Sequence, residues 1–286
     1  MKFAWIHEHS TEFPLNAMCL ALHVSRSGYF RFRHRPLSPR RTRRDALALK
    51  IAHVHAQSRY TYGSPRVHRE LLAHDVNVCV NSVARVMKEE HICARPRPRF
   101  VPRTTDSAHA HPIADNLLKQ DFTADAPNQK WVADITYIRT DEGWLYLAGI
   151  IDLFSRKIVG WSMSEHLHAQ LVTDALRMAI QRRRPPPGLI HHSDRGVQYA
   201  CSDFQQLLLD QRFLCSMSAV GNCYDNAPAE SFWATLKSEL VYHSHYATRT
   251  QAREHIFEYI EVFYNRIRRH SSLNYLSPEA FEAALN

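Results

Sequence analysis

The stretch "KWVADITYIRTDEGWLYLAGIIDLFSRKIVGWSMSE", residues 130 to 165, carries the strongest indication of a fold in this sequence. Apolar, β-branched and aromatic residues fill three runs within it, at 130–140, 143–155 and 156–165. The polar turn "TDEG" separates the first run from the second. Three such runs joined by short connections predict three consecutive antiparallel strands.

The residues that follow alternate between helical and extended patterns. Apolar residues at helical spacing predict helices over 169–184 and 201–213, and short β-prone runs predict strands over 189–194 and 214–218. A further helix is expected within "GNCYDNAPAESFWATLKSELV", residues 221 to 241. The sequence therefore predicts an α/β fold, with helices flanking a mixed five-stranded sheet.

Charge is distributed unevenly along the chain. Residues 1 to 110 contain 19 Lys and Arg against 8 Asp and Glu, whereas residues 111 to 286 contain 17 against 20. A basic part joined to a mildly acidic part indicates a module that binds a polyanion, attached to a domain that retains carboxylates. The alternative is a basic surface that is simply solvated.

Within the basic part, two pairs of short helices are expected, at 18–33 and 62–92. Two helices joined by a tight turn form the helix-turn-helix pattern, whose second helix can enter the major groove of DNA. The candidate DNA-binding residues on these second helices are Arg26, Arg85 and Lys88. The alternative is a small helical bundle that does not touch DNA, because such bundles contain similar pairs.

The part of the chain that joins these helices to the sheet is rich in proline and arginine, as in "ARPRPRFVPR", residues 94 to 103. Such a segment buries too little apolar area to fold alone, so an extended linker is expected. The predicted organisation is a small all-α helix-turn-helix region at 1–92, a linker at 93–120 and an α/β domain at 121–286.

Three carboxylates stand out in the α/β domain: Asp134 inside the first strand, Asp194 at the end of the fourth, and Glu230 in a first helical turn. A carboxylate in an apolar strand is destabilising unless it is paired or bound to a cation. Divalent magnesium binds to such oxygens, and a pair of ions supports phosphoryl transfer. The alternative for Glu230 alone is a carboxylate that merely suits the positive end of a helix dipole.

Three motifs carry a resemblance to a known family: "NQKWVADITYIRT", "HHSDRGVQY" and "GNCYDNAPAESFWATLKSELVY". They resemble the catalytic core of insertion-sequence transposases of the retroviral-integrase superfamily, and more narrowly the protein of the second reading frame (OrfB). Between Asp134 and Asp194 lie 59 residues, and between Asp194 and Glu230 lie 35. The resemblance implies a ribonuclease H-like fold in which Asp134, Asp194 and Glu230 are catalytic and hold two Mg²⁺ (or Mn²⁺) ions.

The same resemblance implies the activity and the partners. It implies metal-dependent cleavage and strand transfer on double-stranded DNA, namely the terminal inverted repeats of the element and a target. It also implies a homo-oligomer on DNA and an upstream-frame protein or fusion. The alternatives are a catalytically silent DNA-binding derivative and a nuclease that cuts without joining.

Further DNA-contact residues are expected around the helix that carries Glu230. Lys237 lies two turns further on the same face and is expected to reach a phosphate, or else to be a surface lysine. The preceding loop supplies Asn222, Tyr224 and Asn226, which either position the loop over DNA or cap the helix.

Other conspicuous residues have weaker indications. Trp233 is expected either to stack on a base or to pack in the core, and neither His191 nor His192 is expected to be a metal ligand because hard cations prefer oxygen. The segment "FYNRIRRHSSL", residues 263 to 273, is expected to contact DNA or to be a solvated helix end.

Location follows from what the sequence lacks. No run approaches the ~18 consecutive apolar residues of a membrane-spanning helix, and the six cysteines form no Cys-x-x-Cys pair. The first residues lack the apolar run of a signal peptide. We therefore expect a cytoplasmic protein with no membrane partner, and the resemblance implies a bacterial, nucleoid-associated one.

Overall fold

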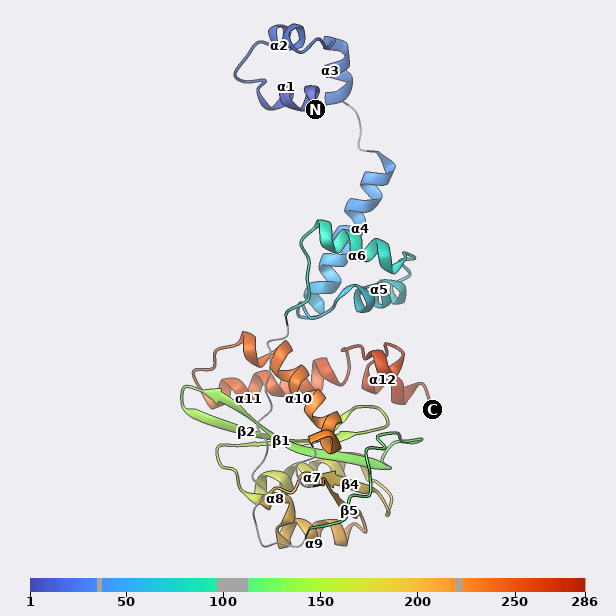
Figure 1. The fold of residues 1–286 in the computed structure, drawn as a ribbon, viewed down its shortest axis with the longest axis vertical. Helices are drawn as coiled ribbons and strands as arrows, with labels where there is room; N and C mark the ends of the chain where they lie inside the picture. Colours follow the sequence, from blue (N-terminus) through green and yellow to red (C-terminus); the bar gives the residue numbers. More distant parts are fainter. Residues whose placement is uncertain (35–37, 97–112, 220–222, 286) are drawn as a thin grey trace.

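The computed structural model describes residues 1–34, 38–96, 113–219 and 223–285. Three groups of elements follow one another along the chain (Figure 1). The first two groups are helical, and the third is built on a sheet. The helices of the first two groups are α1 (Lys2–Glu8), α2 (Leu15–Ala21), α3 (Arg26–Arg33), α4 (Pro39–Gln57), α5 (Ser64–Ala73) and α6 (Val80–Glu89).

The first group closes on a small apolar cluster that contains Ile6, Met18 and Tyr29. The α3 helix begins after Ser25, whose Oγ accepts a hydrogen bond of 3.0 Å from the backbone N–H of Gly28, as an N-cap residue does. The helix pair expected at 18–33 is therefore present as α2 and α3. The sequence patterns did not indicate α1, which contributes Ile6 to the cluster.

The second group contains the other predicted helix pair as α5 and α6. These two helices pack with α4, and Ile51 of α4, Val67 of α5 and Val83 of α6 are fully buried. The α4 helix has 19 residues and was not indicated by the sequence patterns. It supplies the third side that a two-helix unit needs to bury its apolar faces.

The sheet has five strands, in the order β3-β2-β1-β4-β5. The β1–β2 and β2–β3 pairs are antiparallel, whereas β1–β4 and β4–β5 are parallel. This is the mixed five-stranded sheet that the sequence predicted. The strands are β1 (Lys130–Thr140), β2 (Gly143–Asp152), β3 (Ile158–Ser164), β4 (Ile190–Ser193) and β5 (Leu214–Met217).

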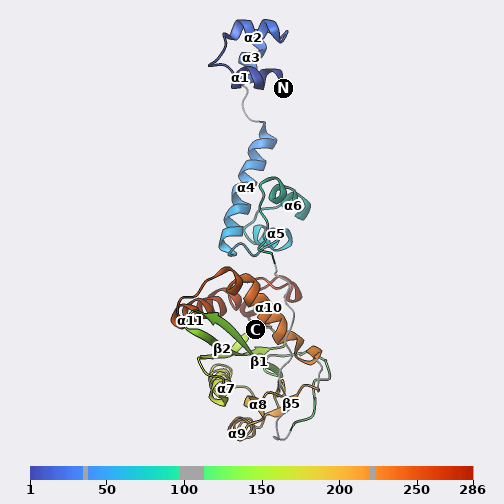
Figure 2. The same ribbon diagram turned by 60° about the vertical axis from the view of Figure 1, so that its left-hand side comes forward.

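Helices cover both faces of the sheet (Figure 1 and Figure 2). One face packs on α7, α8 and α9 through an apolar cluster that includes Trp131 and Leu176, and the other packs on α10 and α11 through Leu147 and Phe232. Gly160 of β3 permits close approach of α7, because a Cβ there would lie 2.3 Å from the carbonyl oxygen of Ala175. These helices are α7 (Ala169–Arg183), α8 (Val197–Ala200), α9 (Ser202–Asp210), α10 (Ala227–Glu239) and α11 (Arg249–Glu258).

The end of the chain folds back across α10. A buried ion pair joins Arg268 to Glu239, the last residue of α10, at 2.7 Å, and the Tyr259 hydroxyl donates to the same carboxylate at 2.7 Å. The remaining short elements are η1 (Cys223–Asn226), η2 (Val241–His243), η3 (Tyr259–Tyr264), η4 (Ser271–Leu273) and α12 (Pro278–Ala283).

The second helical group contacts this C-terminal segment. The backbone N–H of Arg269 donates to the Tyr62 hydroxyl at 2.7 Å, and the Arg269 guanidinium pairs with Glu70 of α5. Arg59 pairs with Glu258 of α11. No helix in the described ranges is long and apolar enough to cross a membrane.

Candidate active site

Asp134 lies in the middle of β1, opposite Gly149 of β2. Its half-buried carboxylate accepts a hydrogen bond of 2.8 Å from the Ile135 N–H and one of 3.1 Å from Nε1 of Trp233. A Cβ at position 149 would lie 2.7 Å from Cη2 of Trp233, so glycine makes room for the indole. Trp233 is therefore a buried side chain that orients Asp134, which decides between its two predicted roles in favour of packing.

Asp194 directly follows β4, the parallel neighbour of β1. Val132 pairs with His192, so Asp134 and Asp194 lie two residues beyond the same level of the sheet. The backbone N–H of Gly196 donates to Oδ1 of Asp194 at 2.9 Å. Two parallel strands thus bring together carboxylates that are far apart in sequence.

Glu230 lies in the first turn of α10, and its side chain is exposed. Burial, the charge of Asp194 and, to a smaller extent, the charge of Glu230 raise the pKa of Asp134 to about 8. The negative charges of Asp194 and Glu230 therefore both act on Asp134.

The carboxylate oxygens match the ligands that Mg²⁺ prefers. Among the described residues, no three His, Cys, Asp or Glu side chains already stand close enough together to hold a metal ion. Burial is the main cause of the raised pKa of Asp134, and repulsion by the negative charge of Asp194 adds to it. A divalent cation is the kind of group that would offset this repulsion, so the donor set fits such an ion.

Lys237 is half-buried on α10, and its Nζ lies 5.5 Å from the ring centre of Tyr137 of β1. Burial lowers the pKa of Lys237, whereas the negative charge of Asp134 raises it. The lysine therefore lies near the carboxylates, as expected from its helical spacing to Glu230.

The loop before α10 is held by a residue that the sequence reasoning missed. The buried Asp225 carboxylate accepts hydrogen bonds from Asn116 Nδ2 at 2.9 Å, Gln120 Nε2 at 3.1 Å and the Ala219 N–H at 2.8 Å. The amide donors come from a segment more than a hundred residues earlier. The only signal in the sequence was an acidic residue inside an otherwise neutral turn.

The predicted loop residues have different outcomes. Asn226 is buried at the start of α10, where its Nδ2 donates to the Ala133 carbonyl at 3.4 Å, while its Oδ1 has no partner among the described atoms. Asn226 makes no side-chain capping bond to α10. Asn222 and the side chain of Tyr224 lie outside the described residues, so their predicted roles stay predictions.

Both histidines beside Asp194 are packed in the interior. His192 lies within hydrogen-bonding distance of the Ser216 and Ser218 hydroxyls, at 2.8 and 3.2 Å, and His191 packs edge-on against Phe204. Burial lowers the pKa of His191 to about 3 and that of His192 to about 4. Both rings are therefore neutral parts of the core.

The other predicted DNA-contact residues lie on the helical groups. Arg85 and Lys88 are exposed on α6, and Arg26 is exposed at the start of α3. The C-terminal arginines differ from the solvated helix end that was one of the two alternatives for 263–273. Arg268 is buried and paired with Glu239, and Arg269 is paired with Glu70, so these two side chains support the fold rather than forming a solvated helix end.

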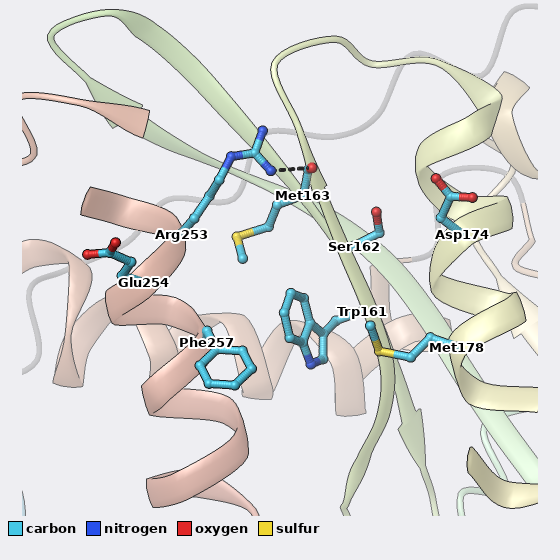
Figure 3. A pocket seen from close by; sticks show the side chains of 8 residues that line it. All are labelled: Trp161, Ser162, Met163, Asp174, Met178, Arg253, Glu254 and Phe257. Carbon is cyan, nitrogen blue, oxygen red and sulfur yellow. Dashed lines mark hydrogen bonds between the residues drawn. The ribbon is translucent and has the colours of Figure 1, made fainter. Parts of the chain in front are cut away.

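A separate apolar pocket of about 530 Å³ lies between β3, α7 and α11 (Figure 3). Trp161, Met163 and Phe257 line it, and a guanidinium N–H of Arg253 donates to the Met163 carbonyl at 2.6 Å. None of the three carboxylates lines this pocket. This hollow is therefore separate from the three carboxylates.

Comparison with known proteins bears on the whole chain. Residues 124–223 and 211–278 match the family described as "Integrase core domain", and residues 42–100 match "HTH-like domain". The first two matches include all three carboxylates, and the third spans α4, α5 and α6.

Full-length relatives are also present. Transposase InsF for insertion sequence IS3A of Escherichia coli (strain K12) is 45% identical over 284 residues, covering 99% of this chain and 98% of the relative. The insertion element IS600 uncharacterized 31 kDa protein of Shigella sonnei is 47% identical over 264 residues, covering 92% and 97%. The HTLV-2 integrase catalytic core domain solved with magnesium is 15% identical with a TM-score of 0.44, covering 56% of this chain and 99% of that one.

The carboxylates of β1, β4 and α10 thus lie inside an integrase core domain, and the relatives match this chain from end to end. The chain belongs to the insertion-sequence transposases with a retroviral-integrase-like core, a family of DDE enzymes.

Proposed function

We propose that this transposase cleaves DNA and joins DNA strands at a centre formed by Asp134, Asp194 and Glu230. The observation that carries the proposal is that Asp194 and Glu230 lie near enough to Asp134 for their charges, in addition to burial, to raise its pKa to about 8. These residues would hold the two divalent ions that family membership implies. When bound, such ions activate the attacking oxygen and stabilise the leaving one.

The residues of the chain have separate tasks in this scheme. Trp233 and the Ile135 N–H fix the Asp134 carboxylate, and the Gly196 N–H fixes that of Asp194. An oxygen of water or of a DNA 3′-hydroxyl forms a bond to phosphorus while the bond to the leaving oxygen breaks. No side chain needs to act as the nucleophile, and Lys237 is placed to contact a phosphate.

DNA would also be held by the helical groups. Arg85 and Lys88 on α6 and Arg26 on α3 are exposed cations on second helices of helix pairs, which is where a recognition helix presents its side chains. The partners would be the terminal inverted repeats and a target duplex. A homo-oligomer on DNA, a fusion with an upstream-frame product and a nucleoid location are parts of the same proposal.

The experiment uses the full chain on labelled branched DNA that mimics the joined product. We expect strand exchange with Mg²⁺, and none with EDTA or with Glu230→Gln. Glu258→Gln is the matched control, because it removes an exposed carboxylate of α11 that pairs with Arg59. Exchange that survives Glu230→Gln would contradict the assignment, and DNA binding without exchange in the unaltered chain would favour the silent derivative.

A further inference from the structure

A polar pocket of about 400 Å³ borders α10, and none of the three carboxylates lines it. Its lining comes from α5, the segment before β1, the end of β2 and the turn that follows it, the first turns of α10, and the end of η3 with the segment that follows it. We call it the basic pocket, and the side chains that define its character are Arg66, Arg156, Arg268, His270, Ser231 and Thr235.

The three arginines of the basic pocket are not equally compensated. Arg268 is neutralised by the buried Glu239 at 2.7 Å, and the Arg66 guanidinium lies 5.7 Å from the ring centre of Tyr62. Arg156 is half-buried, and burial lowers its pKa. Among the described residues its guanidinium makes no ion pair or hydrogen bond, so a cation is held out of water without a carboxylate beside it.

The backbone also fixes the position of Arg156. The residue has a φ of 60°, a left-handed conformation that is uncommon for a side chain of this size. Its N–H donates to the Asp152 carbonyl at 2.8 Å, which closes the turn between β2 and β3. The guanidinium is therefore presented to the pocket by a defined turn and not by a flexible loop end.

The charges of the three arginines converge on His270. Burial is the main cause of its lowered pKa of about 2, and Arg268, Arg66 and Arg156 add to it in that order. His270 is therefore neutral at physiological pH. No Asp or Glu is among the described residues that line the pocket, so the surplus charge of the lining is positive.

The remaining lining supplies hydrogen-bond donors. Ser231 and Thr235 of α10 and Ser271 and Ser272 of the C-terminal segment contribute hydroxyl groups. The first turn of α10 also borders the pocket through Ala227 and Pro228. Guanidinium groups, hydroxyls and a helix N-terminus together favour a phosphate oxyanion over other anions.

Helix geometry relates this pocket to the carboxylates. At about 100° per residue, Thr235 lies about 140° around α10 from Glu230. A helix is ~10 Å across with its side chains, which corresponds to about three nucleotide rises of 3.4 Å along a DNA strand. A strand that passes over the start of α10 can therefore place one phosphate at the carboxylates and another in the basic pocket.

We propose that the basic pocket binds a backbone phosphate of the DNA whose reacting phosphate lies at Asp134, Asp194 and Glu230. This inference rests on the proposed function, because it assigns the DNA a second point of attachment on the same helix. Arg156 is its principal charged contact, and Ser231 and Thr235 are its hydroxyl donors. Binding there orients the strand across α10.

The first test measures binding of full-length protein to labelled branched DNA at several salt concentrations. Arg156→Ala is expected to weaken binding roughly tenfold and to reduce the slope of log K against log salt by about 0.9, the value for one lost phosphate contact. Arg177→Ala is the matched control, because Arg177 is exposed on α7 across the sheet; it is expected to change neither quantity.

A second variant guards against loss of folding. Ser231→Asp places a negative charge at an exposed position of the lining, and it is expected to weaken DNA binding at least as much while leaving the melting temperature near that of the unaltered protein. Arg156→Lys is expected to recover part of the affinity. If folded Arg156→Ala and Ser231→Asp proteins bind DNA as Arg177→Ala does, the proposal is wrong.

The source of the phosphate is tested with pyrophosphate as the free probe. DNA is expected to displace pyrophosphate from the unaltered protein. Arg156→Ala is expected to lose both the binding of pyrophosphate and its displacement by DNA. Pyrophosphate binding that depends on Arg156 while the DNA slope stays unchanged would contradict the assignment to DNA. The strand-exchange assay with Glu230→Gln tests the carboxylates and does not test the basic pocket. A failure of the proposed function is therefore distinguishable from a failure of the phosphate-binding proposal.

Discussion

The carboxylates at the two ends of α10 have opposite electrostatic surroundings. At its first turn, Glu230 joins Asp134 and Asp194 in a group of anions, and the pKa of Asp134 is raised by burial and then by the charges of the other two. At its last residue, the buried Glu239 is matched by the Arg268 guanidinium at 2.7 Å and the Tyr259 hydroxyl at 2.7 Å. One helix therefore begins beside an anionic cluster and ends at a compensated centre.

The difference shows how to read a buried carboxylate. A charge with a guanidinium and a hydroxyl around it is satisfied by the fold, and removing one partner leaves the other stranded. A charge surrounded by other anions destabilises the fold unless a ligand supplies the missing cation. Local rules are broken mainly where function requires it, and the start of α10 is such a place.

The largest expected effect comes from the anionic cluster. Asp134→Asn is expected to reduce strand exchange by at least ~1000-fold, because it removes a carboxylate that stabilises the reacting phosphate. In EDTA it is expected to raise the free energy of unfolding by about 1 kcal/mol, because it relieves repulsion. Exchange assays and urea denaturation measure the two quantities. If Asp134→Asn lost both activity and stability, Asp134 would behave like the paired Glu239, which would contradict the comparison.

The compensated centre is expected to show the reverse behaviour. Glu239→Gln is expected to lower the free energy of unfolding by about 3–5 kcal/mol, because the buried Arg268 loses its counter-ion. Urea denaturation with Glu258→Gln as the control measures this, and the control is expected to change stability by less than about 1 kcal/mol, as an exposed pair does. Equal effects of the two substitutions would contradict the comparison.

Trp233 links the cluster to the core, and its two roles are separable. Trp233→Phe retains an aromatic ring over Gly149 but loses the N–H that donates to Asp134 at 3.1 Å. We expect strand exchange to fall about tenfold, the effect of one hydrogen bond to a charged group. Trp144→Phe, at an exposed position of β2, is the control in the same exchange assay, and equal activities would show that the indole N–H does not position Asp134.

The smallest expected effect concerns pH at the compensated centre. Burial and the adjacent arginines hold the pKa of His270 near 2, whereas an unfolded histidine titrates near 6.5. Below about pH 6.5 the unfolded chain therefore binds a proton at His270 that the folded chain does not bind. The contribution of the neutral His270 to the free energy of unfolding is complete above about pH 6.5, and it is lost as pH falls, by up to about 1.4 kcal/mol per pH unit. His270→Gln is expected to flatten the difference between pH 6.5 and 5, whereas the exposed His243→Gln is not. Parallel pH profiles of His270→Gln and the unaltered protein would show that His270 is accessible to protons.

Much of this arrangement could be predicted from the sequence. The apolar, β-branched and aromatic runs of 130–165 predicted three strands, and the motifs around Asp134, Asp194 and Glu230 predicted residues that β1, β4 and α10 bring near one another. Strands and helix starts are formed by local sequence, so the position of a motif on such an element can be predicted without knowledge of distant contacts. The helix pair at 62–92 was visible for the same reason.

The parts that were missed depend on contacts between distant segments. Asp225 is satisfied by amides of Asn116 and Gln120, and Arg269 by Glu70, and neither pairing leaves a local pattern. The α4 helix was missed because its apolar residues contact α5 and α6 only along part of its length. A run of arginines such as that at 266–269 looks solvated in sequence, and only the fold shows its partners.

The central claim is that the cluster at the start of α10 is completed by a divalent cation. Binding of Mn²⁺ to the full chain, followed by calorimetry and by the shift in melting temperature, tests it most directly, with Asp134→Asn beside Glu258→Gln as its control. The account predicts that Mn²⁺ binds and stabilises the unaltered protein and the control, and that Asp134→Asn abolishes both signals. Undiminished Mn²⁺ binding by Asp134→Asn would contradict it.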